Sequence, residues 1–111
     1  MKIETADYSL DCSGGVAVLD GVLRLHSPVA YEGVFEGVRE ALLAATSTFV
    51  IDLAGVRFMN SSGITALSRL VLLARNSDKP LMIKGNTQVA WQQKTITSLQ
   101  RLYKGLEVEF N

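Results

Sequence analysis

Apolar residues recur at the 3.6-residue spacing of an amphipathic helix in three stretches of the chain. The apolar positions are Tyr31, Phe35, Val38, Leu42 and Ala45 in the first stretch, Ile64, Leu67, Val71 and Ala74 in the second, and Val89, Ile96, Leu99 and Tyr103 in the third. These patterns predict helices that begin after Pro28, near Ser62 and near Thr87. We expect the third helix to end at Lys104-Gly105, because glycine is favoured just beyond a helix C-terminus.

Mostly apolar runs separate these helices and predict buried strands. Phe49–Leu53 lies between the first and second helices, and Leu81–Lys84 lies between the second and third. Leu106–Phe110 then alternates apolar and charged residues, as does a strand with one face in water. A strand, helix and strand in succession favour a right-handed parallel crossover.

The N-terminal region has a shorter, strand-like pattern. Tyr8–Cys12 predicts a short edge strand, which Ser13-Gly14-Gly15 ends. Val16–Leu19 and Val22–His26 flank Asp20-Gly21, a dipeptide that favours the type I′ turn of a two-residue hairpin. The order of elements predicts an α/β fold, with a mixed sheet, a parallel β-α-β-α-β core and helices packed against it.

Length and composition are typical of one domain over residues 1–111, with 48% hydrophobic residues to form its core. The chain has 11 basic and 11 acidic residues and no run of either sign, so we expect neither a nucleic-acid nor a membrane partner. Met1–Asp7 contains acids where a signal peptide needs an apolar core, which favours a cytoplasmic protein. With one cysteine and one histidine, we expect no metal site and no cofactor.

The most informative segment runs from Val50 to Ile64, where an apolar strand leads through a short turn to Asn60-Ser61-Ser62-Gly63. A helix that begins there directs unpaired backbone N–H groups and the positive end of its dipole toward the hydroxyls. Such a position suits phosphate chemistry. Hydroxyls at a helix start also serve as ordinary caps, so the composition alone leaves both interpretations open.

This segment resembles the signature of STAS domains of the bacterial anti-sigma-factor antagonist type. The residues that carry the resemblance are Asp52-Leu53-Ala54-Gly55-Val56, Phe58-Met59 and Asn60-Ser61-Ser62-Gly63-Ile64, and a weaker likeness extends from about Val18 to Phe110. The resemblance implies a non-enzymatic, partner-switching STAS-like domain. Its partner would be a serine kinase that is also an anti-sigma factor, or a related regulator. The kinase would phosphorylate a serine of this domain, and a phosphatase would remove the phosphate.

The resemblance also implies roles for individual residues. The phosphorylated serine of the family corresponds to Ser62, with Ser61 as the alternative, and the partner-binding surface corresponds to Asn60, Ser61, Ser62, Gly63 and Ile64. The family motif usually begins with Asp, where this chain has Asn60. Asparagine caps a helix about as well as aspartate, so we expect the fold to be unaffected and only use by the kinase to weaken.

Two other functions are compatible with the sequence. The first is a scaffold or accessory subunit, for instance of a transporter ATPase, that uses the same surface without phosphorylation; a weak homodimer is a further possibility. The second is a small serine hydrolase with a Ser62–His26 pair, which the absence of a G-x-S-x-G elbow disfavours.

The remaining candidates each have a structural interpretation. Gly63 permits either a close partner backbone or tight packing on the preceding strand. Asp52 and Trp91 are expected to be structural, Asp52 as a carboxylate within a strand and Trp91 as a cover for the sheet edge. Leu70, Leu72 and Leu73 give the second helix more apolar surface than one buried face needs, which indicates that some of them belong to an interface.

Overall fold

Six strands form one sheet in which neighbours in the sequence are also neighbours in space. A computed structural model describes all residues from Met1 to Asn111. The elements in chain order are β1 (Lys2–Glu4), β2 (Tyr8–Ser13), β3 (Val16–Leu23), α1 (Pro28–Ala44), β4 (Phe49–Met59), α2 (Ser61–Asn76), β5 (Leu81–Gly85), α3 (Ala90–Gln100) and β6 (Glu107–Phe110).

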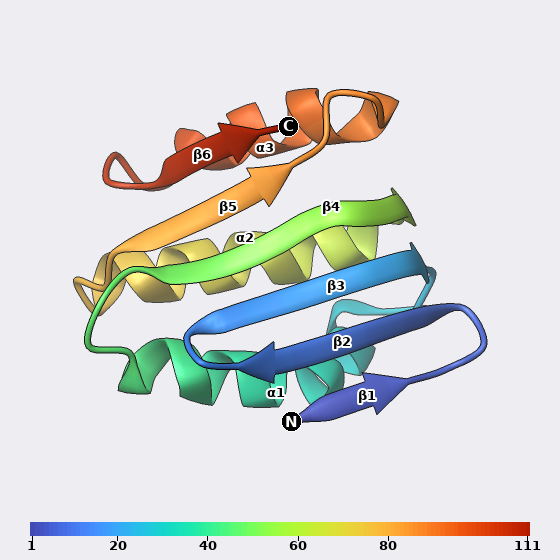
Figure 1. The fold of residues 1–111 in the computed structure, drawn as a ribbon, viewed down its shortest axis with the longest axis horizontal. Helices are drawn as coiled ribbons and strands as arrows, with labels where there is room; N and C mark the ends of the chain where they lie inside the picture. The colour runs from blue at the N-terminus through green and yellow to red at the C-terminus, as the bar shows by residue number, and fades with distance from the viewer.

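The first three strands pair antiparallel, and β3 to β6 pair parallel through the helices that connect them. Each crossover adds its strand on the same side of the one before, so all three helices lie on one face of the sheet (Figure 1). The other face has no covering layer. This arrangement confirms the α/β fold with a mixed sheet and a parallel core.

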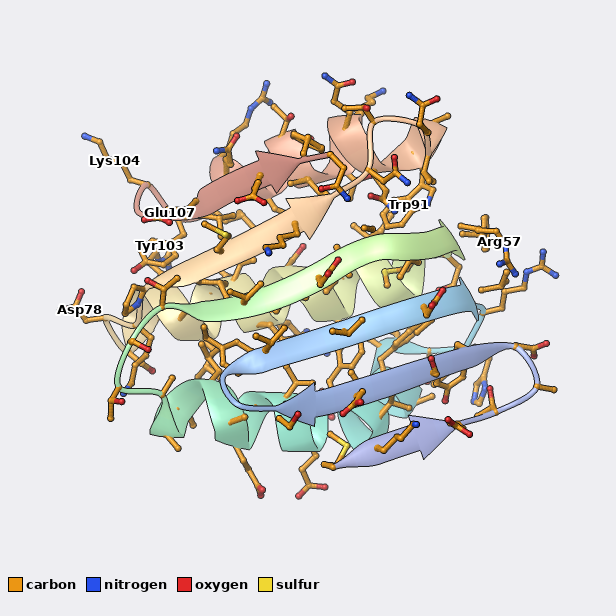
Figure 2. All side chains as sticks on the ribbon, in the orientation of Figure 1. Arg57, Asp78, Trp91, Tyr103, Lys104 and Glu107 are labelled. Carbon is orange, nitrogen blue, oxygen red and sulfur yellow. The ribbon has the colours of Figure 1, made fainter.

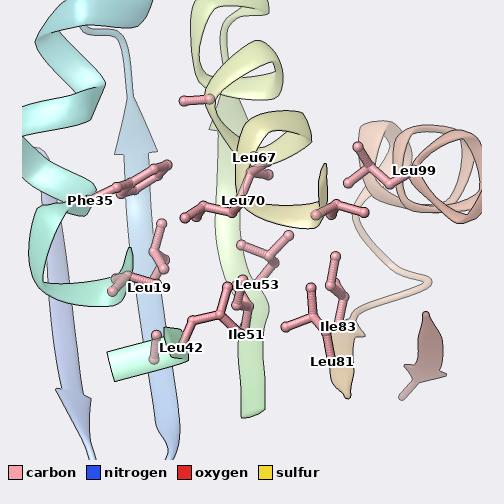
Figure 3. Packing of buried hydrophobic residues seen from close by; sticks show 14 of the residues in the cluster. Leu19, Phe35, Leu42, Ile51, Leu53, Leu67, Leu70, Leu81, Ile83 and Leu99 are labelled. Carbon is pink, nitrogen blue, oxygen red and sulfur yellow. The ribbon is translucent and has the colours of Figure 1, made fainter. Parts of the chain in front are cut away.

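The core lies between the sheet and the three helices. Alternate residues of the strands point toward the helices, which is the period-2 geometry of a pleated strand. Leu19, Ile51 and Ile83 from the sheet meet Phe35, Leu67 and Leu99 from the helices (Figure 3). None of the helices has the length and apolar character that a membrane span requires.

The start of α1 follows from its local sequence. The Ser27 hydroxyl accepts a hydrogen bond from the backbone N–H of Ala30 at 3.1 Å, and Pro28 occupies the first turn, where its missing N–H costs nothing. Tyr31, Phe35, Val38 and Leu42 are the buried residues of this helix, as their spacing predicts.

The predicted hairpin at Asp20-Gly21 is wrong. β3 runs without interruption from Val16 to Leu23, and the turn lies earlier, at Gly14 and Gly15, whose φ angles are +58° and +81°. Gly21 also has a positive φ of +99°, but it lies where the register of β3 against β4 shifts. Its left-handed conformation therefore serves an irregularity within a strand.

Tyr8–Cys12 was also expected to be an edge strand, and here too the structure differs. β1 pairs with β2 on its outer side, and the N-terminal ammonium of Met1 donates to the carbonyl of Cys12 at 3.1 Å. β1 has three residues, which is too short for a hydrophobic period to reveal it.

The third helix is shorter than predicted, and Lys104-Gly105 does not cap it. α3 ends at Gln100, and Gly105 is not among the residues with positive φ. Beyond the helix, the Tyr103 hydroxyl donates to the carbonyl of Lys79 at 3.0 Å, at the end of the sheet opposite Trp91 (Figure 2). This long-range bond anchors residues that local spacing assigned to the helix.

Replacing Gly21 with Ala should destabilise the fold, because the new Cβ would collide with the backbone carbonyl of Asp7 and would require a left-handed alanine. We expect the free energy of unfolding to fall by about 2–5 kcal/mol in urea titrations. Gly14→Ala is the matched control, since Gly14 is also left-handed but has open space around it. It should cost only about 1–2 kcal/mol, and equal losses in the two variants would contradict the steric argument.

Candidate functional site

Asn60 forms the junction between β4 and α2. Its backbone is extended, with φ −76° and ψ 173°, and its Oδ1 accepts a hydrogen bond from the N–H of Gly63 at 3.0 Å. This is the standard N-cap arrangement, in which a side chain satisfies one of the free donors of the first turn. Asn60 therefore caps α2, and Ser61 is its neighbour.

The Asn60 side chain also joins two other parts of the protein. Its Oδ1 accepts from the Tyr31 hydroxyl of α1 at 2.7 Å, and its Nδ2 donates to the carbonyl of Leu25, just before α1, at 2.7 Å. One amide thus links α2, α1 and the connection that follows β3. These bonds use both its acceptor and its donor groups.

The bond to Leu25 argues against the expectation that the fold is indifferent to Asn or Asp at position 60. An aspartate would still accept from Gly63 and Tyr31, but its second oxygen would face the carbonyl of Leu25 with no proton between them. Two acceptors at hydrogen-bonding distance repel, and the Leu25 carbonyl would lose its donor. We therefore expect this junction to depend on the amide, separately from any effect of position 60 on the neighbouring serines.

Tyr31 is fully buried, and its ring stacks at a tilt against Phe35 with centroids 5.7 Å apart. Burial raises the pKa of its hydroxyl above the ordinary value, because the phenolate would lose its hydration. The hydroxyl therefore stays protonated and donates a hydrogen bond to the Asn60 side chain.

Ser61 and Ser62 are the first two residues of α2, and neither side chain forms a hydrogen bond within the chain. Ser61 is exposed, and Ser62 is half-buried. Because Asn60 already caps the helix, neither hydroxyl is needed as a cap. They remain free for chemistry or for a partner.

Gly63 and Ile64 lie deeper. Gly63 is buried, and a Cβ there would meet the side chains of Met59, at the end of β4, and of Tyr31. Tight packing on the preceding strand therefore accounts for glycine at this position without a partner. Ile64 is partly buried against the core.

A groove of about 700 Å³ runs between α1 and α2. Its apolar lining comes from Val29, Phe35, Ala66, Leu70, Leu72 and Leu73. Leu70, Leu72 and Leu73 gave the second helix its excess of apolar surface. All three line the groove, but Leu70 is a buried residue of the core, so only Leu72 and Leu73 are left for an interface. Across the groove, the Arg69 guanidinium donates to the Glu32 carboxylate at 3.1 Å, an exposed pair that contributes at most about 1 kcal/mol.

The two serines differ in their relation to this groove. Ser62 precedes Ala66, Arg69 and Leu73 by 4, 7 and 11 residues, a spacing that places all four on one side of a helix. Ser62 is thus at the head of the groove wall that α2 provides. Ser61 is one residue earlier, about 100° further round the helix.

The other candidates occupy structural positions. The Asp52 Oδ1 accepts from the backbone N–H of Ala54 at 2.9 Å, and no hydrogen bond joins His26 to Ser62. Trp91 is partly buried at the carboxyl end of β4, where its Nε1 donates to the carbonyl of Val56 at 3.1 Å (Figure 2). No group of three or more His, Cys, Asp and Glu side chains has an arrangement that could hold a metal ion.

Gln92 is a polar residue that the sequence did not reveal. It is fully buried, its Nε2 donates to the carbonyls of Leu53 and Val56 at 2.7 and 2.8 Å, and its Oε1 accepts from the N–H of Asn86 at 2.7 Å. Leu53 and Val56 lie beyond the part of β4 that pairs with β5, so Gln92 supplies the hydrogen bonds that a neighbouring strand would otherwise make to their carbonyls. The only signal in the sequence was a glutamine within a helix, one residue from Trp91.

Comparison with known proteins places the fold. No protein-family profile matches the chain, and no curated protein matches it significantly. Among solved structures, SiaC of Pseudomonas aeruginosa matches with a TM-score of 0.73 and 14% identity, over 100% of this chain and 98% of SiaC. A chain in the crystal structure of the diguanylate cyclase SiaD in complex with its activator SiaC, from the same organism, matches with a TM-score of 0.73 and 13% identity, over 100% and 99%. The chain therefore has the fold of SiaC.

Replacing Asn60 with Asp should lower the free energy of unfolding by about 1–3 kcal/mol near neutral pH, because the Leu25 carbonyl loses its donor. Part of this loss should be recovered below about pH 4, where a protonated carboxyl can donate again. Thermal unfolding at both pH values measures the effect.

Asn86→Asp is the matched control, because the Asn86 side chain acts only as an acceptor, from the N–H of Gln88 at 2.9 Å. It should change stability by less than about 0.5 kcal/mol. If Asn60→Asp is equally mild, the amide of Asn60 is not what holds the junction together.

Tyr31 should make the protein less stable at alkaline pH. In the unfolded chain its hydroxyl ionises near pH 10, while in the folded protein its raised pKa retains the proton, so the free energy of unfolding falls as the pH rises above about 10. Tyr31→Phe should cost about 0.5–1.5 kcal/mol at pH 8 and lose stability less steeply above pH 10. Urea titrations at several pH values compare the slopes, and parallel curves would show that Tyr31 does not titrate differently on folding.

Proposed function

We propose that this protein is a non-enzymatic, cytoplasmic regulator that binds a protein partner through the N-terminal half of α2 and the adjoining α1–α2 groove. The observation that carries this proposal is the pair of hydroxyls at Ser61 and Ser62, which remain unbonded because Asn60 caps the helix. The likeness of the fold to SiaC, which is described as an activator in complex with the diguanylate cyclase SiaD, supports a partner-binding role.

We further propose that phosphorylation of Ser62 controls this binding, as the resemblance to STAS antagonists implies. A phosphate adds about two negative charges and three acceptor oxygens. At the first turn of α2 the helix dipole favours that charge, so the modified domain should stay folded. At the head of the groove wall the same charge would enter the interface, and binding should fail.

The geometry favours Ser62 over Ser61 for this role. Ser62 is half-buried and in line with three groove residues, Ala66, Arg69 and Leu73, whereas Ser61 is exposed and is in line with only one apolar groove residue, Leu72. A charge at Ser61 could remain hydrated beside a bound partner. The partner itself is either a serine kinase of the anti-sigma type or an enzyme that the protein activates.

The runner-up function is a constitutive accessory subunit that uses the same surface without modification. The unbonded hydroxyls are equally suited to hydrogen bonds with a permanent partner. Intact mass of the protein from its native cells distinguishes the two functions, because a phosphate adds about 80 Da and should be absent after Ser62→Ala. A protein that never carries this mass under any growth condition would favour the accessory role.

Ser62→Glu should leave thermal stability nearly unchanged and weaken partner binding. A carboxylate at the helix start stabilises by about 0.3–1 kcal/mol, while an unpaired charge in an interface costs several kcal/mol. We expect an affinity loss of about tenfold to a thousandfold, measured by calorimetric titration against the partner purified with the wild-type protein.

The matched control is Ser61→Glu, which introduces the same charge one residue away. It should reduce affinity by less than about threefold, since an exposed charge interacts weakly across solvent. Equal affinities for the wild type and Ser62→Glu would place Ser62 outside the contact surface. Equal losses in the two variants would show a general charge effect and not a specific switch.

A further inference from the structure

The face of the sheet opposite the helices has no covering layer, although β3 to β6 are parallel. Parallel strands are usually covered on both faces, because their connections put helices on both sides. Figure 1 looks directly onto this uncovered face. The composition of the face indicates what kind of element would complete it.

An apolar patch lies on the uncovered face near the amino ends of β3, β4 and β5. The strand register places Val16 of β3 beside Val50 of β4, and Val50 beside Met82 of β5. Val18 lies two residues further along β3, and 40% of its surface is exposed. These residues form one patch that spans three adjacent strands, a width of about 10 Å.

Carboxylates flank this patch on both sides. In the strand register, Asp11 of β2 lies beside Val18. Glu107 of β6, which Figure 2 labels, lies beside Met82. The solvent-facing residues of the strands include six acids against two lysines and one arginine, Arg57, although the whole chain has equal numbers of acidic and basic residues. The acids are Glu4, Asp11, Asp20, Asp52, Glu107 and Glu109.

Both lysines of this face already have acidic neighbours. Lys2 pairs with Glu4 at 3.0 Å, and the Lys84 ammonium lies 4.0 Å from the Glu109 carboxylate. The four carboxylates that form no ion pair are those of Asp11, Asp20, Asp52 and Glu107. The uncovered face therefore has a small apolar patch near the amino ends of β3, β4 and β5 and an excess of carboxylates around it, including Asp52 of β4, which lies beside Val18.

We propose that this face docks a basic amphipathic helix of a partner protein. A helix about 10–12 Å wide would lay its apolar side on Val16, Val18, Val50 and Met82. Lysines or arginines on its two flanks would reach Asp11 on one side and Glu107 on the other, since β2 and β6 are about 19 Å apart. Because acids lie on both flanks, the helix could bind with its N-terminus toward either end of the strands.

The negative charge of this face also disfavours two other binding partners, a second copy of the chain and a membrane. A symmetric second copy of the chain would bring two negative faces together, and an anionic membrane would be repelled in the same way. The proposed contact is independent of Ser62, because α2 lies on the opposite side of the sheet. Binding here and control at Ser62 can therefore fail separately.

The test uses a synthetic peptide of about five helical turns, with leucines on one face and lysines on both flanks. Its binding to the full chain is measured by fluorescence anisotropy, and its position by amide chemical shifts. We expect a dissociation constant on the order of 10 µM and shifts in β3, β4 and β5. A permuted peptide of the same composition without an apolar face should bind at least about tenfold more weakly.

One double variant tests the flanks and one single variant tests the patch. Asp11→Asn with Glu107→Gln should weaken binding about tenfold, and Val18→Lys at least as much. The matched control is Glu36→Gln with Glu40→Gln, which removes two exposed acids from α1 and should change affinity less than about twofold. Thermal melts establish that each variant is folded, and the isosteric flank variant is decisive if Val18→Lys is not.

Four results would overturn the proposal: no binding of the amphipathic peptide, equal binding of the permuted peptide, equal weakening by the flank and control variants, or amide shifts confined to α1 and α2. The second and third would reduce the contact to general electrostatic attraction. None of these results bears on Ser62, whose role is decided by the Ser62→Glu titration.

Discussion

The side chain of Asn60 is the interaction on which the arrangement around α2 depends. Its oxygen accepts from Gly63 and Tyr31, and its nitrogen donates to Leu25, so one amide joins α2 to α1 and to the connection after β3. A buried junction of this kind needs an acceptor and a donor in one short side chain, which asparagine supplies and aspartate does not. The position of α2, and with it the direction in which Ser62 points, follows from this junction.

The second constraint is the one-sided sheet. Because each crossover has the same hand and each strand is added on the same side, the helices form a single layer and the core lies entirely between that layer and the sheet. The molecule therefore has two different surfaces. The helical side has the α1–α2 groove and Ser62, and the sheet side has an apolar patch bordered by carboxylates. Because the sheet separates the two surfaces, contact at one leaves the other open.

Local patterns in the sequence decided much of the fold. The helical periods of residues 31–45 and 64–74, the apolar strands between them and the order of elements determined a parallel core with α1, α2 and α3. These patterns are informative because a helix or strand usually buries one face, and the apolar residues of that face recur at a fixed spacing along the chain. The strand-turn-helix segment that ends at Ser61 and Ser62 was visible for the same reason.

Only the tertiary structure decided the contacts between distant residues. The same left-handed glycine signal serves a turn at Gly14-Gly15 and a register shift at Gly21, and only the pairing of β3 with β2 and β4 distinguishes them. Asn60 bonds to Leu25, 35 residues away, and Gln92 bonds to Leu53, 39 residues away. Hydrophobic periodicity specifies which side of a helix or strand is buried. A buried hydrogen bond between two elements also depends on which polar groups face each other after the elements pack, and the spacing of residues within one element does not contain that information. The sequence by itself therefore determined the helices, most of the strands and their order, and the packing determined which groups the Asn60 amide contacts and which residues line the groove.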